Sequence, residues 1–286
     1  MRVEARAKVN FTLEVFGKRA DGYHALRSVV MPISLCDTLD IEATDDGKIV
    51  SDTGYDDDLC VKAARVLKSS VSGLSSMSGA RIRVAKRIPA GGGLGGGSAD
   101  AAAVLRALND LWQIGFSREK LAEIGAQVGS DVPALVLGGP VVMEGRGEQV
   151  RPIGTFACGD VSSGRALHLV LVNPGVHSST KDVYAACESR PEGGVDATAR
   201  MVEALKAGEV ERIAAALMND LQTPAVKLHS EIAGALGALR AAGVVGAMMS
   251  GSGSSVFGLV PDAVTAERIA SELRGRGFQT WAVQTR

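Results

Sequence analysis

Hydrophobic and polar side chains alternate with a period of two over residues 2–16. The odd-numbered positions from Val3 to Val15 are apolar, whereas the even-numbered positions, Lys8 and Asn10 among them, are polar. Successive side chains of a strand point to opposite faces of a sheet, so this alternation indicates a long strand. We therefore expect the chain to begin with a strand that has one buried face.

The rest of the chain divides into further strands and helices. Apolar runs and alternation predict strands at residues 26–35, 38–43, 81–88, 166–173, 244–248, 254–260 and 278–283. Helical spacing of apolar residues predicts helices at 58–71, 99–112, 117–128, 196–218, 231–242 and 262–275. These elements interleave without a steady βαβ rhythm, which favours an α+β fold. A polar stretch at 154–165 predicts a boundary between two domains, residues 1–157 and 158–286.

Composition and charge narrow the function classes. The chain has 286 residues and a net charge of −1, which does not suit an electrostatic nucleic-acid binder. It lacks an apolar run of 18 residues and an apolar signal segment at its start, so we expect no membrane partner. The four cysteines lack zinc-binding spacing, which favours a reduced, cytoplasmic setting.

Glycine is the exceptional residue, with 35 copies, six of them in the seven positions 91–97. A flexible connection does not need so many glycines, because each costs about 1 kcal/mol when ordered. Glycines instead allow main-chain N–H groups to turn towards an anion. Ser98 is a good N-cap for the helix that follows, and a helix N-terminus would add partial positive charge.

Two familiar phosphate loops fit this segment poorly. Walker A requires a lysine before the final serine, but Gly97 precedes Ser98. The dinucleotide-binding pattern fits formally at Gly91, Gly93 and Gly96, but a second predicted helix follows where that fold needs a strand.

A family resemblance accounts for this loop and for four other segments. Residues 89–99 resemble the glycine loop of the galactokinase, homoserine kinase, mevalonate kinase and phosphomevalonate kinase (GHMP) superfamily. Within it, the chain is most similar to the 4-diphosphocytidyl-2-C-methyl-D-erythritol kinases. The other similar segments are 7–11 (AKVNF), 19–24 (RADGYH), 129–133 (GSDVP) and 249–255 (MSGSGSS). The resemblance implies a ribosomal-S5-like N-terminal nucleotide-binding domain and a ferredoxin-like C-terminal domain.

The same resemblance implies an activity and its catalytic pair. The enzyme would transfer the γ-phosphoryl group of ATP to the 2-hydroxyl of 4-diphosphocytidyl-2-C-methyl-D-erythritol, in non-mevalonate isoprenoid biosynthesis. From the pattern alone, Lys8 suits a solvated strand lysine, and Asp131 suits a helix N-cap. The resemblance instead makes Lys8 and Asp131 catalytic, with Asp131 taking the hydroxyl proton and Lys8 stabilising charge.

Ligand-binding residues also follow from the resemblance. The ATP phosphates would lie against Pro89, Ala90, Gly91, Gly92, Gly93, Leu94, Gly95, Gly96, Gly97, Ser98 and Ala99. Ser98 would also contribute its hydroxyl to Mg²⁺. The cytidine diphosphate-linked substrate would contact Asn10, Tyr23, His24, Thr180, Tyr184, Gly251, Ser252 and Gly253. His24 would read the cytosine edge, and Tyr184 would stack on the base.

Two positions depart from the family's pattern, and alternatives remain open. Asp58 stands where relatives commonly have asparagine, and Ala99 stands where many have a second serine. Another superfamily kinase, for mevalonate or homoserine, would share the glycine loop. A non-catalytic nucleotide-binding protein would also share it. We expect a monomer or a weak homodimer.

Overall fold

Two unusually long strands form the centre of the sheet in the first lobe. The computed structural model describes residues 1–154, 166–189 and 196–286. Strand β1 (Arg2–Lys18) pairs antiparallel with β2 (His24–Thr44). The remaining strands of this sheet are β3 (Ile49–Ser51), β4 (Gly79–Ala85), β5 (Val141–Gly145), β6 (Gln149–Pro152) and β8 (Met218–Asn219). They form a seven-stranded sheet of order β3-β4-β2-β1-β8, in which β5 joins β2 to β6.

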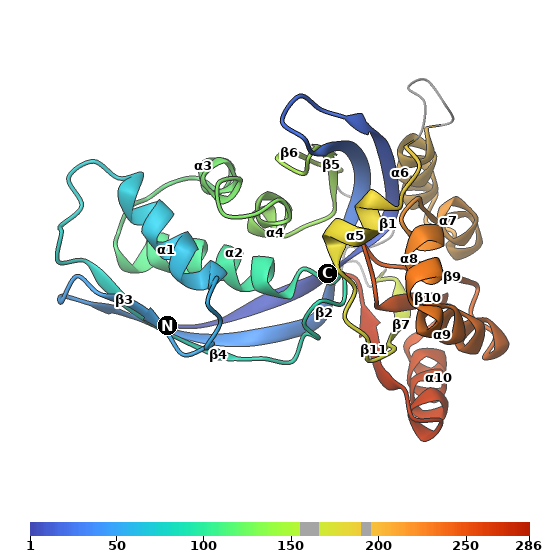
Figure 1. Cartoon of the computed structure of the whole chain (residues 1–286). Coiled ribbons are helices and arrows are strands. Elements are labelled where there is room, and N and C mark those ends of the chain that lie inside the picture. The colour runs from blue at the N-terminus through green and yellow to red at the C-terminus, as the bar shows by residue number, and fades with distance from the viewer. Residues whose placement is uncertain (155–165, 190–195) are drawn as a thin grey trace.

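Four helices cover one face of this sheet (Figure 1). They are α1 (Leu59–Ser69), α2 (Gly96–Leu111), α3 (Arg118–Gly125) and α4 (Val132–Leu137). Helix α2 is alanine-rich, with Ala101, Ala102 and Ala103 almost wholly buried, so it packs closely on β1 and β2. The glycine loop precedes α2, and Asp131 precedes α4, so both lie at N-terminal helix ends on the same side of the sheet.

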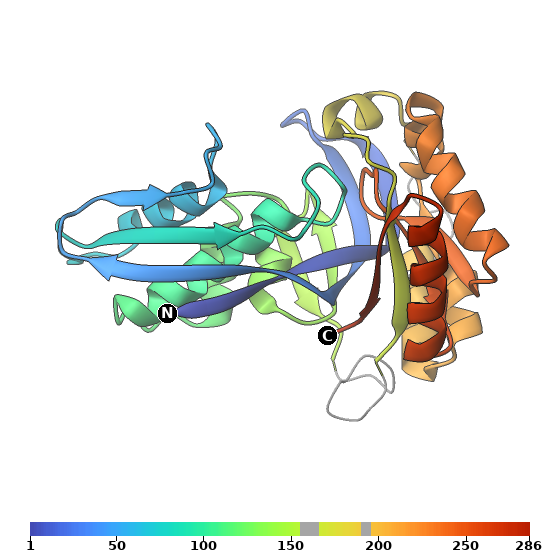
Figure 2. The ribbon, with the colours of Figure 1, turned by 90° about the horizontal axis from the view of Figure 1, so that it is seen from below.

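The second lobe is a four-stranded antiparallel sheet backed by helices. Its strands are β7 (His168–Asn173), β9 (Gly246–Met249), β10 (Val256–Val260) and β11 (Gln279–Gln284), in the order β11-β7-β10-β9. Its helices are α5 (Thr180–Ala185), α6 (Ala197–Ala207), α7 (Val210–Ala216), α8 (Gln222–Leu228), α9 (Ser230–Ala241) and α10 (Ala263–Gly275). Figure 2 shows the long strands of the first lobe running into this helix-backed sheet.

The two lobes are joined by strand pairing as well as by packing. Strand β8 comes late in the chain yet pairs in parallel with β1, through Thr12 and Met218. An isolated bridge between Ile33 and Thr285 ties β2 to the end of the chain. One continuous apolar cluster also contains residues of both lobes, for example Phe11 stacked on Phe257 with ring centroids 5.6 Å apart.

The expected α+β organisation is confirmed, but several boundaries were wrong. Residues 26–35 and 38–43 belong to one strand, β2, rather than two. The expected helix at 196–218 is two helices and a short strand, because Gly208 adopts a left-handed conformation that ends α6. The predicted domain boundary falls almost entirely in 155–165, outside the described residues.

The largest error concerns the second half of β1, which is buried on both faces, whereas Arg2, Glu4 and Arg6 in its first half are exposed as expected. Lys8, Asn10, Thr12 and Glu14 are all at most 3% exposed. Glu14 accepts the N–H groups of Ala197 and Thr198 at the start of α6, which explains how a carboxylate is tolerated there. From Lys8 to Glu14 the polar face of β1 is therefore covered by other parts of the chain and is not solvated.

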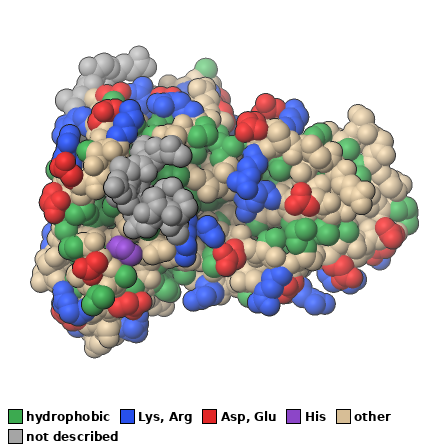
Figure 3. All heavy atoms as spheres, turned by 180° about the vertical axis from the view of Figure 1, so that it is seen from behind, with side chains coloured by type: hydrophobic (Ala, Val, Ile, Leu, Met, Phe, Trp, Pro, Cys, Tyr) green, Lys and Arg blue, Asp and Glu red, His purple; other side chains and the backbone are tan. Residues whose placement is uncertain are grey.

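Surface charge is mixed on the face that Figure 3 presents, where acidic and basic side chains are interspersed. In the described part of the chain, no helix has the length and apolar character needed to cross a membrane.

Candidate active site

The glycine loop is held through its carbonyl oxygens. The carbonyl oxygens of Gly92, Gly93 and Leu94 accept hydrogen bonds from the Ser255 N–H, the Ser250 hydroxyl and the Lys8 N–H, at 3.0–3.1 Å. Among the described residues, no hydrogen bond uses an N–H group of residues 91–97. The loop therefore presents donors without protein partners, which is the arrangement that an anion requires.

Close packing explains why this loop needs glycine. A Cβ on Gly93 would lie 2.1 Å from the carbonyl oxygen of Ser250, and Gly93 has a φ of +73°. A Cβ on Gly91 would lie 2.1 Å from Nδ1 of His177. The glycine loop and the 250–253 loop are thus in direct backbone contact, although about 157 residues separate Gly93 from Ser250.

The helix after the loop starts earlier than its sequence suggests. Gly95, in a left-handed conformation, is the N-cap of α2, and Ser98 lies within the first turn. The expectation that Ser98 caps the helix was therefore wrong. Gly95 replaces it because the chain must turn sharply above Lys8, with no room for a side chain. The Ser98 hydroxyl is consequently not used as a cap.

Lys8 and Asp131 meet beside the loop. The Nζ of Lys8 lies 3.3 Å from Oδ2 of Asp131 and donates to Oδ1 of Asn10 at 2.7 Å. Lys8 is 3% exposed, whereas the Asp131 side chain is 28% exposed and makes no capping bond to α4. The pair is covered by the glycine loop, since a Cβ on Gly95 would lie 3.2 Å from the Lys8 stem. The carboxylate is thus oriented by Lys8 yet open to a ligand.

Asn10 links this pair to the 250–253 loop. Its Nδ2 donates to Ser28, and its backbone N–H donates to the hydroxyl of Ser250. A Cβ on Gly251 would lie 3.3 Å from Nζ of Lys8 and 3.4 Å from Oδ1 of Asn10. The 250–253 loop therefore closes over Lys8 from the second lobe.

Aromatic side chains from both lobes meet within electrostatic reach of Asp131. The rings of His24 and Tyr184 lie 5.7 Å apart, and Nδ1 of His24 contacts the carbonyl oxygen of Phe16 at 3.1 Å. Burial, and secondarily Asp131, raises the pKa of Tyr184, so its hydroxyl stays neutral. Tyr23 is 55% exposed and lies outside this pair.

Thr180 is joined to the 250–253 loop. Its hydroxyl lies 2.9 Å from that of Ser252, and the neighbouring Ser178 donates to the Ser252 carbonyl oxygen. The start of α5 is thereby held against this loop.

Two known domain families match the chain. Residues 58–139 match the GHMP kinases N terminal domain, and residues 201–279 match the GHMP kinases C terminal domain. A 4-diphosphocytidyl-2-C-methyl-D-erythritol kinase of Pelotomaculum thermopropionicum is 40% identical, over 98% of this chain and 96% of its own. The enzyme of the same name from Symbiobacterium thermophilum is 38% identical, over 100% and 99%. The chain belongs to this kinase family.

Solved structures agree with that assignment. A crystal structure of 4-(cytidine 5'-diphospho)-2C-methyl-D-erythritol kinase superposes with a TM-score of 0.82 and 35% identity, covering 100% of this chain and 99% of the other. A homoserine kinase from Cytophaga hutchinsonii superposes with a TM-score of 0.75 at 18% identity, covering 100% and 94%. The second likeness shows the shared fold alone.

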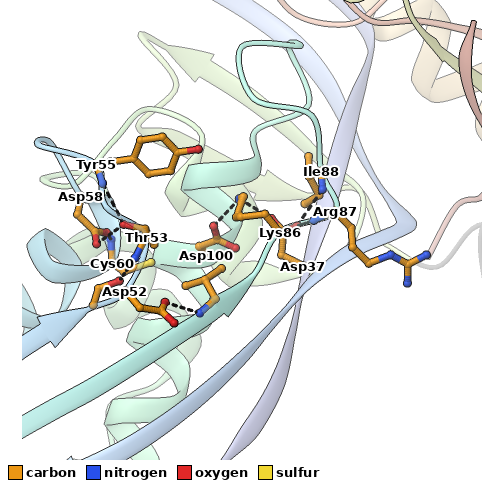
Figure 4. Close-up of polar contacts among 12 residues, drawn as sticks. Asp37, Asp52, Thr53, Tyr55, Asp58, Cys60, Lys86, Arg87, Ile88 and Asp100 are labelled. Atoms are coloured by element: carbon orange, nitrogen blue, oxygen red, sulfur yellow. Dashed lines mark hydrogen bonds and ion pairs between the residues drawn. The ribbon is translucent and has the colours of Figure 1, made fainter.

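A largely buried ionic cluster fixes the segment that leads from β4 into the glycine loop, and the sequence pattern did not indicate it. Nζ of Lys86 lies 2.5 Å from Oδ2 of Asp37 and 2.7 Å from Oδ2 of Asp100 (Figure 4). Oδ1 of Asp37 also accepts the N–H groups of Arg87 and Ile88. The cluster therefore fixes the chain between β4 and the loop to the first turn of α2.

One cation serves two carboxylates in this cluster. Burial raises the pKa of Asp100 to about 7, although Lys86 opposes the shift. Oδ1 of Asp100 is buried without a hydrogen-bond partner among the described residues. Burial would lower the pKa of Lys86, but its hydrogen bonds to Asp100 and Asp37 raise it. Lys86 is thus a firmly charged anchor below the loop.

Asp58, the departure from the family's pattern, has a clear local role. Its Oδ1 accepts the N–H groups of Cys60 and Val61, and its Oδ2 accepts the Thr53 hydroxyl (Figure 4). Burial opposes ionisation, but these bonds and one with Ser51 lower its pKa. Asp58 is therefore an ionised N-cap of α1 whose oxygens are already occupied.

Asn219 is a further residue that sequence reasoning missed. Its Nδ2 donates to the carbonyl oxygens of Met249 and Gly251, both at 2.9 Å. Asn219 is the last residue of β8, so these hydrogen bonds fix the 250–253 loop directly to the sheet that carries Lys8. Nothing in the spacing of the sequence indicates this contact, because β8 is only two residues long.

Proposed function

We propose that this protein transfers the γ-phosphoryl group of ATP to the 2-hydroxyl of 4-diphosphocytidyl-2-C-methyl-D-erythritol, giving the 2-phosphate, in non-mevalonate isoprenoid precursor biosynthesis. The observation that carries the proposal is the Lys8–Asp131 pair, 3.3 Å apart, beside a loop whose N–H groups at residues 91–97 find no partner in the described part of the chain. Family membership supports ATP as the co-substrate and a small molecule as the acceptor.

In the proposed chemistry, the oxygen of the substrate hydroxyl bonds to the γ-phosphorus of ATP, and the bond from that phosphorus to ADP breaks. Asp131 accepts the proton that the hydroxyl loses. Asp131 suits this role because it makes no capping bond and keeps a partly exposed carboxylate. Lys8 supplies fixed positive charge at the same point, and Asn10 holds its ammonium in place. Phosphoryl transfer depends mainly on such positioning, so no covalent enzyme intermediate is required.

We assign the ATP phosphates to residues 89–99. The N–H groups of residues 91–97, which have no hydrogen-bond partner among the described residues, and the N-terminus of α2 supply partial positive charge there. No cluster of three or more His, Cys, Asp or Glu residues that could hold a metal is found in the described ranges. We therefore propose that Mg²⁺ is held mainly by the phosphates of the nucleotide, with the Ser98 hydroxyl as a ligand from the protein. Bound Mg²⁺ would neutralise charge on the phosphates.

We assign the cytidine end of the substrate to His24 and Tyr184, with Thr180 beside them. The 5.7 Å separation of the two rings supports this pocket, because a pyrimidine needs an aromatic surface and a polar edge. The 250–253 loop, with Gly251, Ser252 and Gly253, would close over the reacting groups. Tyr23 is proposed as an outer contact, since its exposed ring lies under the guanidinium of Arg146.

The broader organisation is also part of the proposal. The ATP-binding domain would span 1–157 and the substrate-binding domain 158–286, in keeping with the end of β6 at Pro152 and the start of β7 at His168. We propose a cytoplasmic enzyme that acts as a monomer or weak homodimer.

A coupled assay with ATP, Mg²⁺ and each acceptor tests the function. We expect turnover with the cytidyl substrate and none with mevalonate or homoserine. The reverse preference would overturn the substrate, and nucleotide binding without any turnover would overturn the enzyme activity itself.

A further inference from the structure

A small cavity between the helices of the first lobe is lined by three arginines. It has a volume of about 180 Å³ and lies between the β1–β2 strands and helices α2, α3 and α4. Its charged lining consists of Arg6, Arg106, Arg118 and Glu4. Neither Lys8 nor Asp131 lines it, and among residues 89–99, to which we assign the ATP phosphates, only Ala99 is a lining residue.

Arg106 is the unusual member of this cluster. Its Nη1 donates to the carbonyl oxygen of Leu135 at 2.9 Å, but no carboxylate pairs with it in the described part of the chain. A guanidinium has five N–H donors, so most of its capacity is unused. Burial, followed by the charges of Arg118 and Arg6, lowers the pKa of Arg106 to about 10. The chain thus carries a half-buried cation whose partial desolvation is not offset by a carboxylate of the described residues.

The neighbouring charges do not relieve this cost. Arg118 donates to the carbonyl oxygen of Leu137 at 2.9 Å, so its partner is also neutral. Glu4 is the single acid among the described lining residues, and it is paired with Arg6 at 3.3 Å. Three guanidinium groups against one carboxylate leave two positive charges facing one cavity.

The size and charge of the cavity define what would fit. Pockets that enclose a whole cofactor commonly have volumes of about 300–1,000 Å³, which exceeds the space here. Planar guanidinium groups bind the oxygens of phosphate in pairs, with charge-assisted hydrogen bonds. We propose that this cavity binds a compact oxyanion, namely the phosphate or diphosphate group of a small ligand.

The position of the cavity connects it to the catalytic elements. Arg106 and Ala99 are seven residues apart on α2 and line the same cavity, and Ala99 lies in the first turn after the glycine loop. Arg6 precedes Lys8 by two residues on β1. An anion bound here bridges α2 and α3 beneath α4, the helix that Asp131 precedes. Its binding free energy therefore acts on elements that hold both the loop and the proposed base.

Calorimetric titration tests the site with the glycine loop saturated by a non-hydrolysable ATP analogue and Mg²⁺. Inorganic phosphate, inorganic diphosphate and glycerol 3-phosphate are the three probes, so that free and esterified phosphate are distinguished. Variants Arg118→Gln and Arg106→Met remove two of the guanidinium groups. Arg83→Gln is the matched control, because Arg83 is an exposed strand arginine of the same lobe outside the cavity.

We expect at least one probe to bind the wild-type protein with the loop occupied. Loss of a charge-assisted contact should weaken that binding about tenfold or more in Arg118→Gln and Arg106→Met, but not in Arg83→Gln. Arg118→Gln should keep its basal kcat and its KM for ATP, and it decides the result if Arg106→Met fails to fold. Absence of binding with the loop occupied, or equal weakening in Arg83→Gln, would overturn the proposal.

Discussion

Gly95 offers a sharp test of how the glycine loop positions Lys8, the lysine to which we assign charge stabilisation. Its φ is +68°, and a Cβ there would lie 3.2 Å from both Cγ and Cε of Lys8 and 3.5 Å from Oδ2 of Asp131. The substitution Gly95→Ala therefore presses one methyl group on the lysine stem. The stem must move by a few tenths of an ångström, because carbon atoms seldom approach so closely.

The magnitude follows from two separate effects. An alanine in the left-handed region costs about 1–2 kcal/mol of stability, wherever it lies. Gly115→Ala isolates that effect, because Gly115 has a φ of +75° and open space around its Cβ position. Misplacing a reacting group by about 1 Å costs roughly 10²-fold in rate, so a smaller shift of Lys8 should lower kcat about tenfold.

Thermal unfolding and steady-state kinetics measure the two effects. Both variants should lose similar stability, with Tm lowered by several degrees. Only Gly95→Ala should lose kcat, while its KM for the cytidyl substrate changes little. Equal kcat values for Gly95→Ala and Gly115→Ala would refute the idea that this loop sets the position of Lys8.

Substitutions at four further positions probe the surroundings of the site. Tyr184→Ala should raise KM for the cytidyl substrate about 5- to 150-fold without changing KM for ATP, whereas Tyr184→Phe retains stacking; equal effects of both would contradict this. Asn219→Ala should lower Tm and raise KM, since two loop carbonyls lose donors of about 1 kcal/mol each. Asp58→Ala should cost about 0.5–2 kcal/mol in denaturant unfolding, as for other N-caps. Burial raises the pKa of Asp100 from 3.8 to about 7, so the stability that protonated Asp100 gives the folded protein is lost as the pH rises through that range. The Tm of Asp100→Asn relative to that of the wild type should therefore increase from pH 4 to pH 8. A Tm difference that does not change with pH would contradict the raised pKa.

Regular patterns in the sequence were enough to predict most elements of the fold. The alternation over residues 2–16 correctly predicts β1, because each strand residue changes face. The same pattern could not reveal that Lys8 and Asn10 are buried, since the covering residues, such as Ser250, come some 240 positions later. Whether a strand residue is buried depends on the segments that pack over it in the folded chain, and the local sequence does not show which segments these are.

The candidate site shows the same division. The Lys8–Asp131 approach was predicted through the family resemblance, and the geometry of the two groups agrees with it. The Asp37–Lys86–Asp100 cluster was missed, because its members come from three elements and carry no recognisable spacing. Periodicity and motif both describe neighbours along the chain, whereas an ionic cluster is a property of packing.

The pairing of a phosphate loop with Asp131 as the base is tested most directly by single-turnover transfer in Asp131→Asn. The amide has nearly the shape of the carboxylate but cannot accept the proton, and general-base catalysis contributes about 10²–10⁴-fold. We predict that the rate of transfer from ATP to the cytidyl substrate falls by that factor while both ligands still bind. Transfer at the wild-type rate would contradict the account.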